Sequence, residues 1–292
     1  MEVNQNIILF IMNLPPGTIE AVREYEKEFG QSLRIMLLRD SRVRDTKGVA
    51  NTPGLDICEI CDFSKPEKIA ETLLPYQNDL LAVTCRSEQY LRRFADVIPH
   101  VPYLRTPSTE SLAWASDKYE MRKRLRAHDP KLTPAFTLVQ KNAKVERERV
   151  IKKIGFPMII KPTNLAASRF VSICYHEEEL EQSLRTIFRR IKKAYAGDNR
   201  LEMPKVIAEQ FMDGDMYSID SYVNSRGGVH HCPLVKVTTG KNIGHDDFYN
   251  YLQLTPTALK PATVAKAEAA AKQAIHALGL RSTTTHTELM KI

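Results

Sequence analysis

The chain has 292 residues, of which 43% are hydrophobic and 26% are charged, and its formal net charge is +7. This apolar content can fill a sizeable core, and the length favours about two domains. No apolar run approaches the roughly 20 residues of a membrane helix, so a spanning protein is excluded. The positive charge leaves nucleic acid, a membrane surface or a small anion as partners.

The first residues predict a buried strand rather than a signal peptide. No basic segment precedes the apolar run 7–12, which ends at Asn13-Leu14-Pro15-Pro16. We therefore expect a cytoplasmic protein. The five cysteines are scattered and odd in number, which argues against a disulfide framework. Cys58 and Cys61 have metal-site spacing, but a strand would send them to opposite faces, so free thiols are favoured over zinc.

The first third of the chain alternates strands with helices. The apolar patterns predict strands at 7–12, 33–38, 55–61 and 80–84. The helical patterns predict helices at 18–29, 66–74 and 87–97, the first with Thr18 as N-cap and Gly30 just past its end. Repeated strand–helix units indicate a parallel sheet with helices on both faces.

The rest of the chain predicts a mixed α+β region. The middle shows helices at 116–126, 145–154 and 177–193, and strands at 135–139, 158–161, 171–175 and 206–211. Its longest helix places Leu180, Leu184, Ile187 and Ile191 on one face. The end shows a hairpin of strands 216–223 and 229–237, a polar loop at 236–251, a helix at 263–278 and a strand at 283–292.

Four features could handle a phosphorylated ligand. Lys161 ends a buried strand, where a bound anion could satisfy its charge; a snorkelling lysine is the alternative. Ser168 lies in a loop of small residues, 164–170, which could approach a phosphate or form an ordinary turn. Strand 206–211 enters an acidic turn that could meet a purine and a ribose, or simply be solvated. Glu288 shares a strand face with His286 and Met290, as a metal ligand or as an exposed edge residue.

Charge alone suggests a different class of partner. Two basic stretches, 122–126 and 189–193, fall in predicted helices. We interpret them mainly as solvated helix faces, because no aromatic residues are interleaved for base stacking. A nucleic-acid-binding protein stays as the alternative from another class.

The order and spacing of these features resemble the ATP-grasp superfamily. The resemblance implies a Rossmann-like domain at 1–112 and an ATP-grasp domain at 113–292, with a lid subdomain at about 133–212. It implies that ATP and Mg²⁺ are bound by residues from each feature. The nucleotide residues would be Lys118, Lys161, Ser168, Glu209, Gln210, Phe211, Met212 and Asp215. Glu288 would hold the metal.

The resemblance implies an enzyme that joins a carboxylate to an amine or similar nucleophile through an acyl-phosphate. Small-molecule substrates follow from it, a homo-oligomer is left open, and His245 and Asp246 are expected to contact the substrate. A non-catalytic ATP-binding regulatory module is the alternative within the family.

Three departures from the family pattern are visible. Ala166 and Ala167 stand where glycines are common, and Met216 stands where a ribose-binding glutamate is usual, so Asp215 would replace it. The strand that supplies the second metal carboxylate would follow Ile292, so we expect weak activity or none from these 292 residues.

Overall fold

The structure is a computed structural model that describes residues 5–43, 48, 51–165, 168–198, 200–245 and 249–292. The chain forms two compact units, Met1–Leu112 and Ala113–Ile292. Each unit has its own hydrophobic core. Among the described residues, no helix is both long and apolar enough to cross a membrane.

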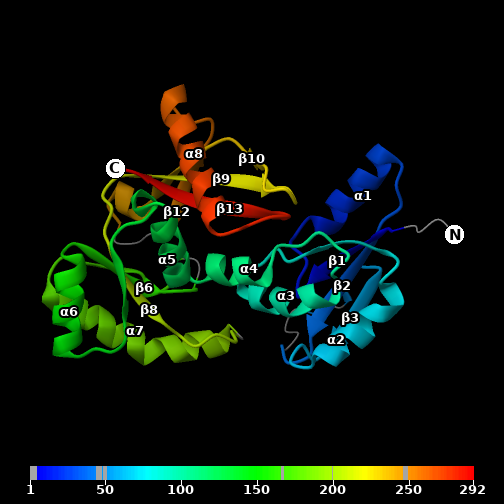
Figure 1. The fold of residues 1–292 in the computed structure, drawn as a ribbon, viewed down its shortest axis with the longest axis horizontal. Coiled ribbons are helices and arrows are strands. Elements are labelled where there is room, and N and C mark those ends of the chain that lie inside the picture. The colour runs from blue at the N-terminus through cyan, green and yellow to red at the C-terminus, as the bar shows by residue number, and fades with distance from the viewer. Residues whose placement is uncertain (1–4, 44–47, 49–50, 166–167, 199, 246–248) are drawn as a thin grey trace. The chain divides into compact units, whose positions relative to one another are not determined.

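The first unit is a parallel α/β domain, as the alternating pattern predicted (Figure 1). Its four strands have the order β3-β2-β1-β4, and every neighbouring pair is parallel. The strands are β1 (Ile7–Ile11), β2 (Arg34–Asp40), β3 (Ile57–Cys61) and β4 (Leu80–Thr84). The helices are α1 (Thr18–Phe29), α2 (Pro66–Leu73) and α3 (Leu91–Val97).

The apolar side chains of this sheet divide between its two faces. One cluster joins β1 and β2 to α2 and α3, and contains Cys61. The other joins the same strands to α1, and contains Cys58. The two cysteines therefore lie on opposite faces, as strand geometry predicted. One detail was wrong, because Gly17 rather than Thr18 is the N-cap of α1, which Gly30 ends at a φ of 64°.

The second unit begins with two helices and then a small antiparallel sheet. The helices are α4 (Thr109–Ser116), which begins in the first unit and which the sequence did not predict, and α5 (Lys118–His128). The sheet has the order β5-β8-β6-β7. Its strands are β5 (Phe136–Val139), β6 (Met158–Pro162), β7 (Ser172–Cys174) and β8 (Val206–Gln210). We call this sheet, with the helices that pack on it, the lid.

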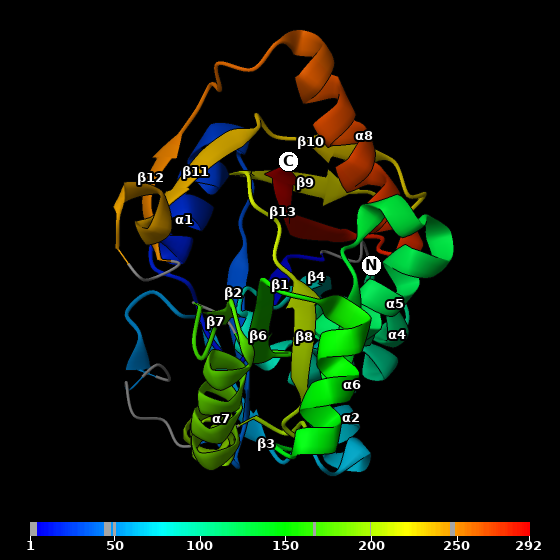
Figure 2. The same ribbon diagram turned by 90° about the vertical axis from the view of Figure 1, so that its left-hand side faces the viewer.

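Two helices cover one face of the lid, α6 (Lys144–Ile154) and α7 (Glu177–Gly197) (Figure 2). The predicted apolar face of α7 is confirmed, because all of its members are at most 3% exposed. These are Leu180, Leu184, Ile187 and Ile191. Neighbouring side chains of a strand point to opposite faces of the sheet. Every second side chain of β6 and β8 therefore points to the face that α6 and α7 leave uncovered.

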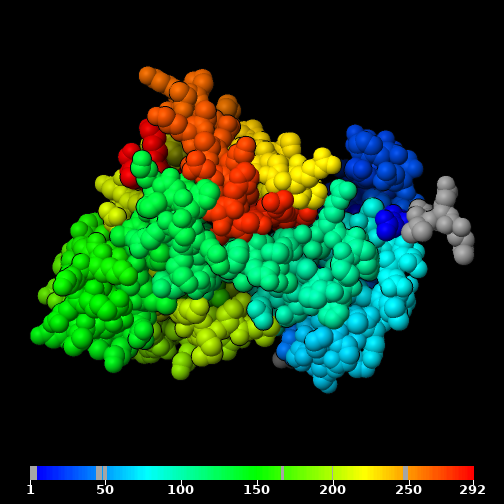
Figure 3. Space-filling view, in the orientation of Figure 1, coloured from blue at the N-terminus to red at the C-terminus, as the bar shows by residue number. Residues whose placement is uncertain are grey.

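A second sheet forms the rest of the unit. Its strands are β9 (Asp215–Val223), β10 (Val229–His231), β11 (Val235–Thr239), β12 (Asn250–Leu254) and β13 (Thr283–Lys291). Strand β9 pairs with β13 along its whole length and with β10 and β11 on its other edge. Helix α8 (Pro261–Ala277) packs on one face through Ala271 and Ile275, and its surface is seen in Figure 3.

Two predictions for this sheet were wrong. The expected strand 229–237 is broken into β10 and β11 around Pro233, which has no N–H to donate to a ladder. The expected loop 236–251 contains the end of β11, a short 3₁₀ helix (Gly240–Ile243) and the start of β12. Residues that were expected in this loop thus form part of the β11–β12 pair and a capping box between Thr239 and Asn242.

Candidate functional site

A buried ion cluster lies on the lid face that α6 and α7 leave uncovered. We call it the Glu209 cluster, and it consists of Arg122, Lys161 and Glu209. Lys161 Nζ lies 2.7 Å from Glu209 Oε2, and Arg122 Nε donates to Glu209 Oε1 at 2.9 Å. Arg122 also donates from a second nitrogen to Oε2 at 3.3 Å. Helix α5 and strands β6 and β8 thus converge on one carboxylate.

The carboxylate is ionised because of its two cations. Glu209 is 3% exposed, and burial alone would raise its pKa. The charges and hydrogen bonds of Lys161 and Arg122 overcome that effect and lower the pKa from 4.5 to about 2. Two predictions need correction here. Lys161 has an anion within the chain, and Arg122, placed in a solvated basic stretch, has a side chain only 15% exposed.

Lys118 binds to the segment that follows Lys161. Its backbone N–H donates to the Thr163 carbonyl at 2.7 Å, and its Nζ donates to the Leu165 carbonyl at 3.0 Å. Because Thr163 is only two residues beyond Lys161, the two predicted ATP lysines meet the same short stretch of chain. The structure therefore brings them to one place on the second unit.

Asp117 fixes the start of α5, and so the position of Lys118. One carboxylate oxygen caps the helix by accepting from the N–H groups of Tyr119 and Glu120. The other accepts from Thr163 Oγ1 at 3.3 Å and lies 3.2 Å from Lys205 Nζ. Helix α5 thus begins at Lys118, two residues later than the predicted start, and its cap at Asp117 also ties it to the lid.

Replacement of Asp117 by alanine should lower the free energy of unfolding by about 1 to 2 kcal/mol, because two helix N–H groups lose their acceptor. Asp117→Asn should cost less, since the amide oxygen still caps the helix. Urea unfolding of both variants measures the difference. Equal losses for the two would assign the effect to the Lys205 pair instead of the cap.

The candidate phosphate loop is held at both of its ends by α7. Tyr195 donates from its hydroxyl to Asn164 Oδ1, and burial raises the pKa of this tyrosine to about 12. Arg169 forms an ion pair with Asp198 at 2.5 Å. Between them, Ser168 has a φ of 53°, in the left-handed region. Ala166 and Ala167 lie outside the described residues.

The predicted nucleotide residues Gln210, Phe211 and Met212 lie where the lid is joined to the second sheet. Gln210 and Phe211 donate their N–H groups to the carbonyls of Ala135 and Pro157, so these amides serve the lid. Among the described residues, no backbone carbonyl accepts from Met212 N–H. Lys241, from the 3₁₀ helix, lies with Nζ 4.2 Å from the centre of the Phe211 ring.

Asp215 is not placed with the other predicted residues. Its carboxylate lies 3.2 Å from Lys236 Nζ, across β9 and β11. In the β9–β13 register Glu288 is opposite Ser218, so Glu288 shares a face with the even-numbered residues of β9. Because the side chains of neighbouring strand residues point to opposite faces, the odd-numbered Asp215 points to the other face of the sheet.

Glu288 is exposed on β13, which pairs with β9. This is the exposed edge position that the sequence left open as one of the two alternatives for Glu288. Its neighbour His286 contacts Asp220, with Nδ1 and Oδ1 2.7 Å apart. Among the described residues, no group of three or more His, Cys, Asp or Glu could hold a metal ion. A lone carboxylate still fits Mg²⁺ carried by phosphates, since that ion often uses one or two carboxylates.

The predicted substrate residues are placed only in part. His245 is exposed and stacks on Tyr251, with ring centres 5.7 Å apart. Asp246 lies outside the described residues. Tyr249, just beyond it, lines a pocket of about 570 Å³ together with Ser168 and residues of β7 and α7. The predicted loop and the predicted phosphate-binding serine thus border one space.

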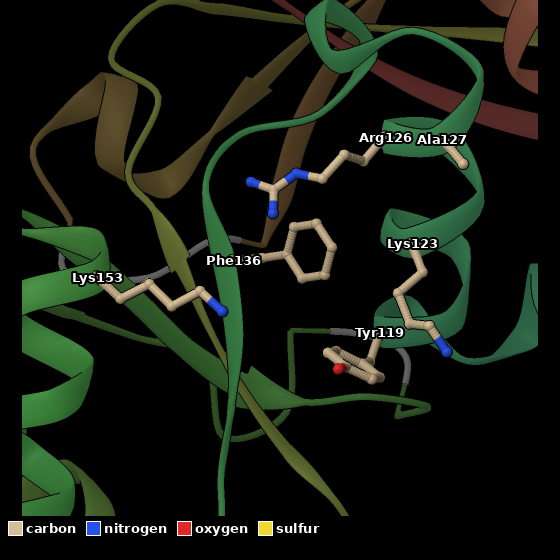
Figure 4. Close-up of a pocket in the computed structure, with 6 residues that line it drawn as sticks. All are labelled: Tyr119, Lys123, Arg126, Ala127, Phe136 and Lys153. Carbon is tan, nitrogen blue, oxygen red and sulfur yellow. The ribbon is translucent and has the colours of Figure 1, made fainter.

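A second pocket, of about 390 Å³, lies between α5, β5 and α6 (Figure 4). Arg126 and Lys153 extend toward it from the two helices, and Phe136 lies between them. The guanidinium carbon of Arg126 is 4.7 Å from the centre of the Phe136 ring. Part of the predicted basic stretch is therefore packed on an aromatic ring instead of being freely solvated.

Sequence reasoning missed Arg122, Lys241 and Tyr195 as members of this region. Arg122 follows Lys118 by four residues, one helical turn, so helix periodicity could have placed the two on one face. For Lys241 and Tyr195 the sequence holds no such signal. Their partners are more than 25 residues away in the chain, and the tertiary fold decides the contacts.

Comparison with known proteins places part of the chain beside a known family. Residues 154–291 match the family model of the ATP-grasp domain. Over 98% of its length the chain superposes on an L-amino acid ligase from Bacillus licheniformis, with a TM-score of 0.72, 20% identity and 64% of that chain covered. An ADP complex of N5-carboxyaminoimidazole ribonucleotide synthetase gives a TM-score of 0.71 at 17% identity, covering 98% of this chain and 66% of that one. Residues 154–291 are therefore similar to an ATP-grasp domain, and the fold of the chain is that of these two ligase and synthetase structures.

Relatives by sequence carry ligase names. The chain is 25% identical over 241 residues to an alanine–anticapsin ligase of Bacillus amyloliquefaciens, covering 78% of this chain and 49% of that protein. It is 24% identical over 151 residues to a D-alanine–D-alanine ligase of Flavobacterium johnsoniae, covering 49% of this chain and 41% of that protein. The chain thus spans about half the length of the relatives that it matches, or less.

Proposed function

We propose that this chain is the nucleotide-binding part of an ATP- and Mg²⁺-dependent ligase that joins a carboxylate to an amine. The convergence of Lys118 and Lys161 on one segment of an ATP-grasp domain carries the proposal. Lys161 begins this segment and the ammonium group of Lys118 contacts it at Leu165, and two cations at one segment suit the charge of a triphosphate. The names of the relatives favour amino acids as the substrate class.

Several of the predicted residues have a role in this proposal. Lys118 and Lys161 bind phosphate oxygens, and the loop at Ser168 covers them. Met212 donates its free N–H to the purine, beside the ring of Phe211. Glu288 holds Mg²⁺, which neutralises the charge that passes from the nucleotide to the carboxylate. Asp215 has no role here, because it points away from Glu288.

The reaction class follows from this arrangement of charge. A substrate carboxylate would accept the terminal phosphoryl group and become an acyl-phosphate. The amine would then displace phosphate and form a carbon–nitrogen bond. The contribution of this chain is to hold the phosphates in line for transfer, which is the main demand of phosphoryl-transfer catalysis.

Calorimetric titration of ATP with Mg²⁺ tests the binding part of the proposal, and saturable binding is the expected result. Phosphate release with pairs of amino acids tests the ligase part. Nucleotide binding without release by any pair would favour a regulatory module. Absence of nucleotide binding, together with binding to DNA or RNA that falls steeply with salt, would overturn the proposal in favour of a nucleic-acid-binding protein.

A further inference from the structure

We infer that Arg122 is a positioning residue that keeps Lys161 available to the nucleotide by neutralising Glu209. The inference rests on the proposed function and adds to it a residue on α5 that touches neither phosphate nor substrate. It addresses a difficulty in the geometry. Lys161, which is proposed to bind phosphate, lies 2.7 Å from the buried carboxylate of Glu209, and this negative charge would cancel that of the lysine.

The hydrogen bonds show how the carboxylate is shared. Among the described residues, Arg122 Nε is the group that donates to Oε1 of Glu209, at 2.9 Å. Oε2 is the oxygen that Lys161 approaches, and the second Arg122 nitrogen reaches it as well, at 3.3 Å. A guanidinium can hold a carboxylate with two nitrogens at once, whereas an ammonium is a point charge. Glu209 therefore keeps a complete partner when Lys161 turns away.

The charges of the Glu209 cluster lead to the same conclusion. Two cations and one anion leave a net charge of +1, and this residual charge can attract a phosphate. Without Arg122 the remaining pair would be neutral. Lys161 would then be the sole counter-ion of a carboxylate that is 3% exposed, and moving it to a phosphate would leave that carboxylate buried and unpaired.

Helix geometry links Arg122 to the rest of the site. Arg122 follows Lys118 by one turn of α5, so both side chains lie on the same side of the helix. The cap at Asp117 fixes the axial position of both, through its bond to Thr163. Helix α5 thus places Lys118 against the chain segment beyond Lys161, and Arg122 against Glu209, the counter-ion of Lys161.

The test is a set of four variants titrated with ATP and ADP in the presence of Mg²⁺, and with adenosine. Arg122→Gln should weaken binding of both phosphorylated nucleotides about tenfold and leave adenosine binding unchanged. Arg122→Lys keeps the charge and should stay within about threefold of the unchanged chain. Lys123→Gln removes one charge from the exposed face of the same helix, where the lysine pairs with Glu120, and serves as the matched control.

The double variant Arg122→Gln/Glu209→Gln separates positioning from simple damage. It frees Lys161 from its carboxylate and restores the net charge of +1, so nucleotide affinity should return to within about threefold of the unchanged chain. Thermal unfolding confirms that each variant is folded at the titration temperature. If Arg122→Gln does not fold, two other variants are compared instead, Arg122→Lys and Arg122→Lys/Glu209→Gln. The double variant has a net charge of +2 in the cluster, and it should bind nucleotide more tightly than Arg122→Lys.

The outcomes distinguish the inference from the function on which it rests. Failure of the unchanged chain to bind any nucleotide would overturn the proposed function, and this inference with it. Nucleotide binding that Arg122→Gln leaves unchanged would overturn only the role of Arg122. Equal losses for ATP, ADP and adenosine, with no recovery in the double variant, would also overturn it, because they indicate a structural role.

Discussion

Lys161→Ala should weaken binding of ATP with Mg²⁺ about 10- to 100-fold, the loss expected for one or two charge-assisted hydrogen bonds to phosphate. The variant should remain folded, because Glu209 keeps both hydrogen bonds to Arg122. Calorimetry with ATP, ADP and AMP measures the effect. The loss should be smallest for AMP, which offers the fewest phosphate oxygens to the lysine.

A surface lysine provides the control for this result. Lys152 lies on the exposed side of α6, and Lys152→Ala removes the same charge without touching the Glu209 cluster. Its affinity for ATP should match that of the unchanged chain. If Lys161→Ala and Lys152→Ala bind ATP equally well, Lys161 does not meet phosphate and the ion cluster is only structural.

Glu209→Ala should lower the free energy of unfolding at pH 7 by about 3 to 5 kcal/mol, the usual cost of leaving largely buried cations without their counter-charge. Arg122 and Lys161 are 15% and 18% exposed, so water can compensate them only in part. Urea unfolding measures the loss. Glu177→Ala is the control, because its carboxylate is 44% exposed and its partner Arg147 keeps a second ion pair with Glu181.

The same carboxylate gives stability a pH dependence with a definite sign. Its pKa is lowered from 4.5 to about 2 by folding, so the folded state holds fewer protons between these values. The stabilisation, about 3 kcal/mol, is complete above roughly pH 5 and is lost as pH falls toward 2. The stability gap between the unchanged chain and Glu209→Gln should therefore narrow by about half or more from pH 7 to pH 3. A constant gap would contradict the lowered pKa.

Most of the fold could be predicted from the sequence, because the patterns that indicate strands and helices are local. Alternating apolar runs predicted the parallel sheet, and the spacing of Leu180, Leu184, Ile187 and Ile191 predicted the buried face of α7. The wrong predictions concern strands whose ends or pairing the apolar pattern does not mark. Pro233 breaks a strand, and β12 has five exposed residues, so no apolar alternation marked it.

The candidate site was predictable only as a set of positions. Residue type and order pointed to Lys118, Lys161 and Glu209, but not to the contacts between them. Lys161 and Glu209 pair because the β6–β8 register puts Ile159 opposite Glu209, and a shift of one residue would separate the two charges. Register depends on the packed sheet, so pairing could not be predicted from either strand alone.

The contact between Lys241 and the lid includes a solvent-exposed hydrogen bond. Lys241 Nζ donates to the hydroxyl of Tyr175 at 2.9 Å, and Tyr175 is 54% exposed. A hydrogen bond in water contributes only about 0.5 to 1.5 kcal/mol, so thermal motion breaks it often. Separation of Lys241 from Tyr175 therefore costs little energy, and under the proposed function the tight binding of a nucleotide would have to come from contacts with its phosphates.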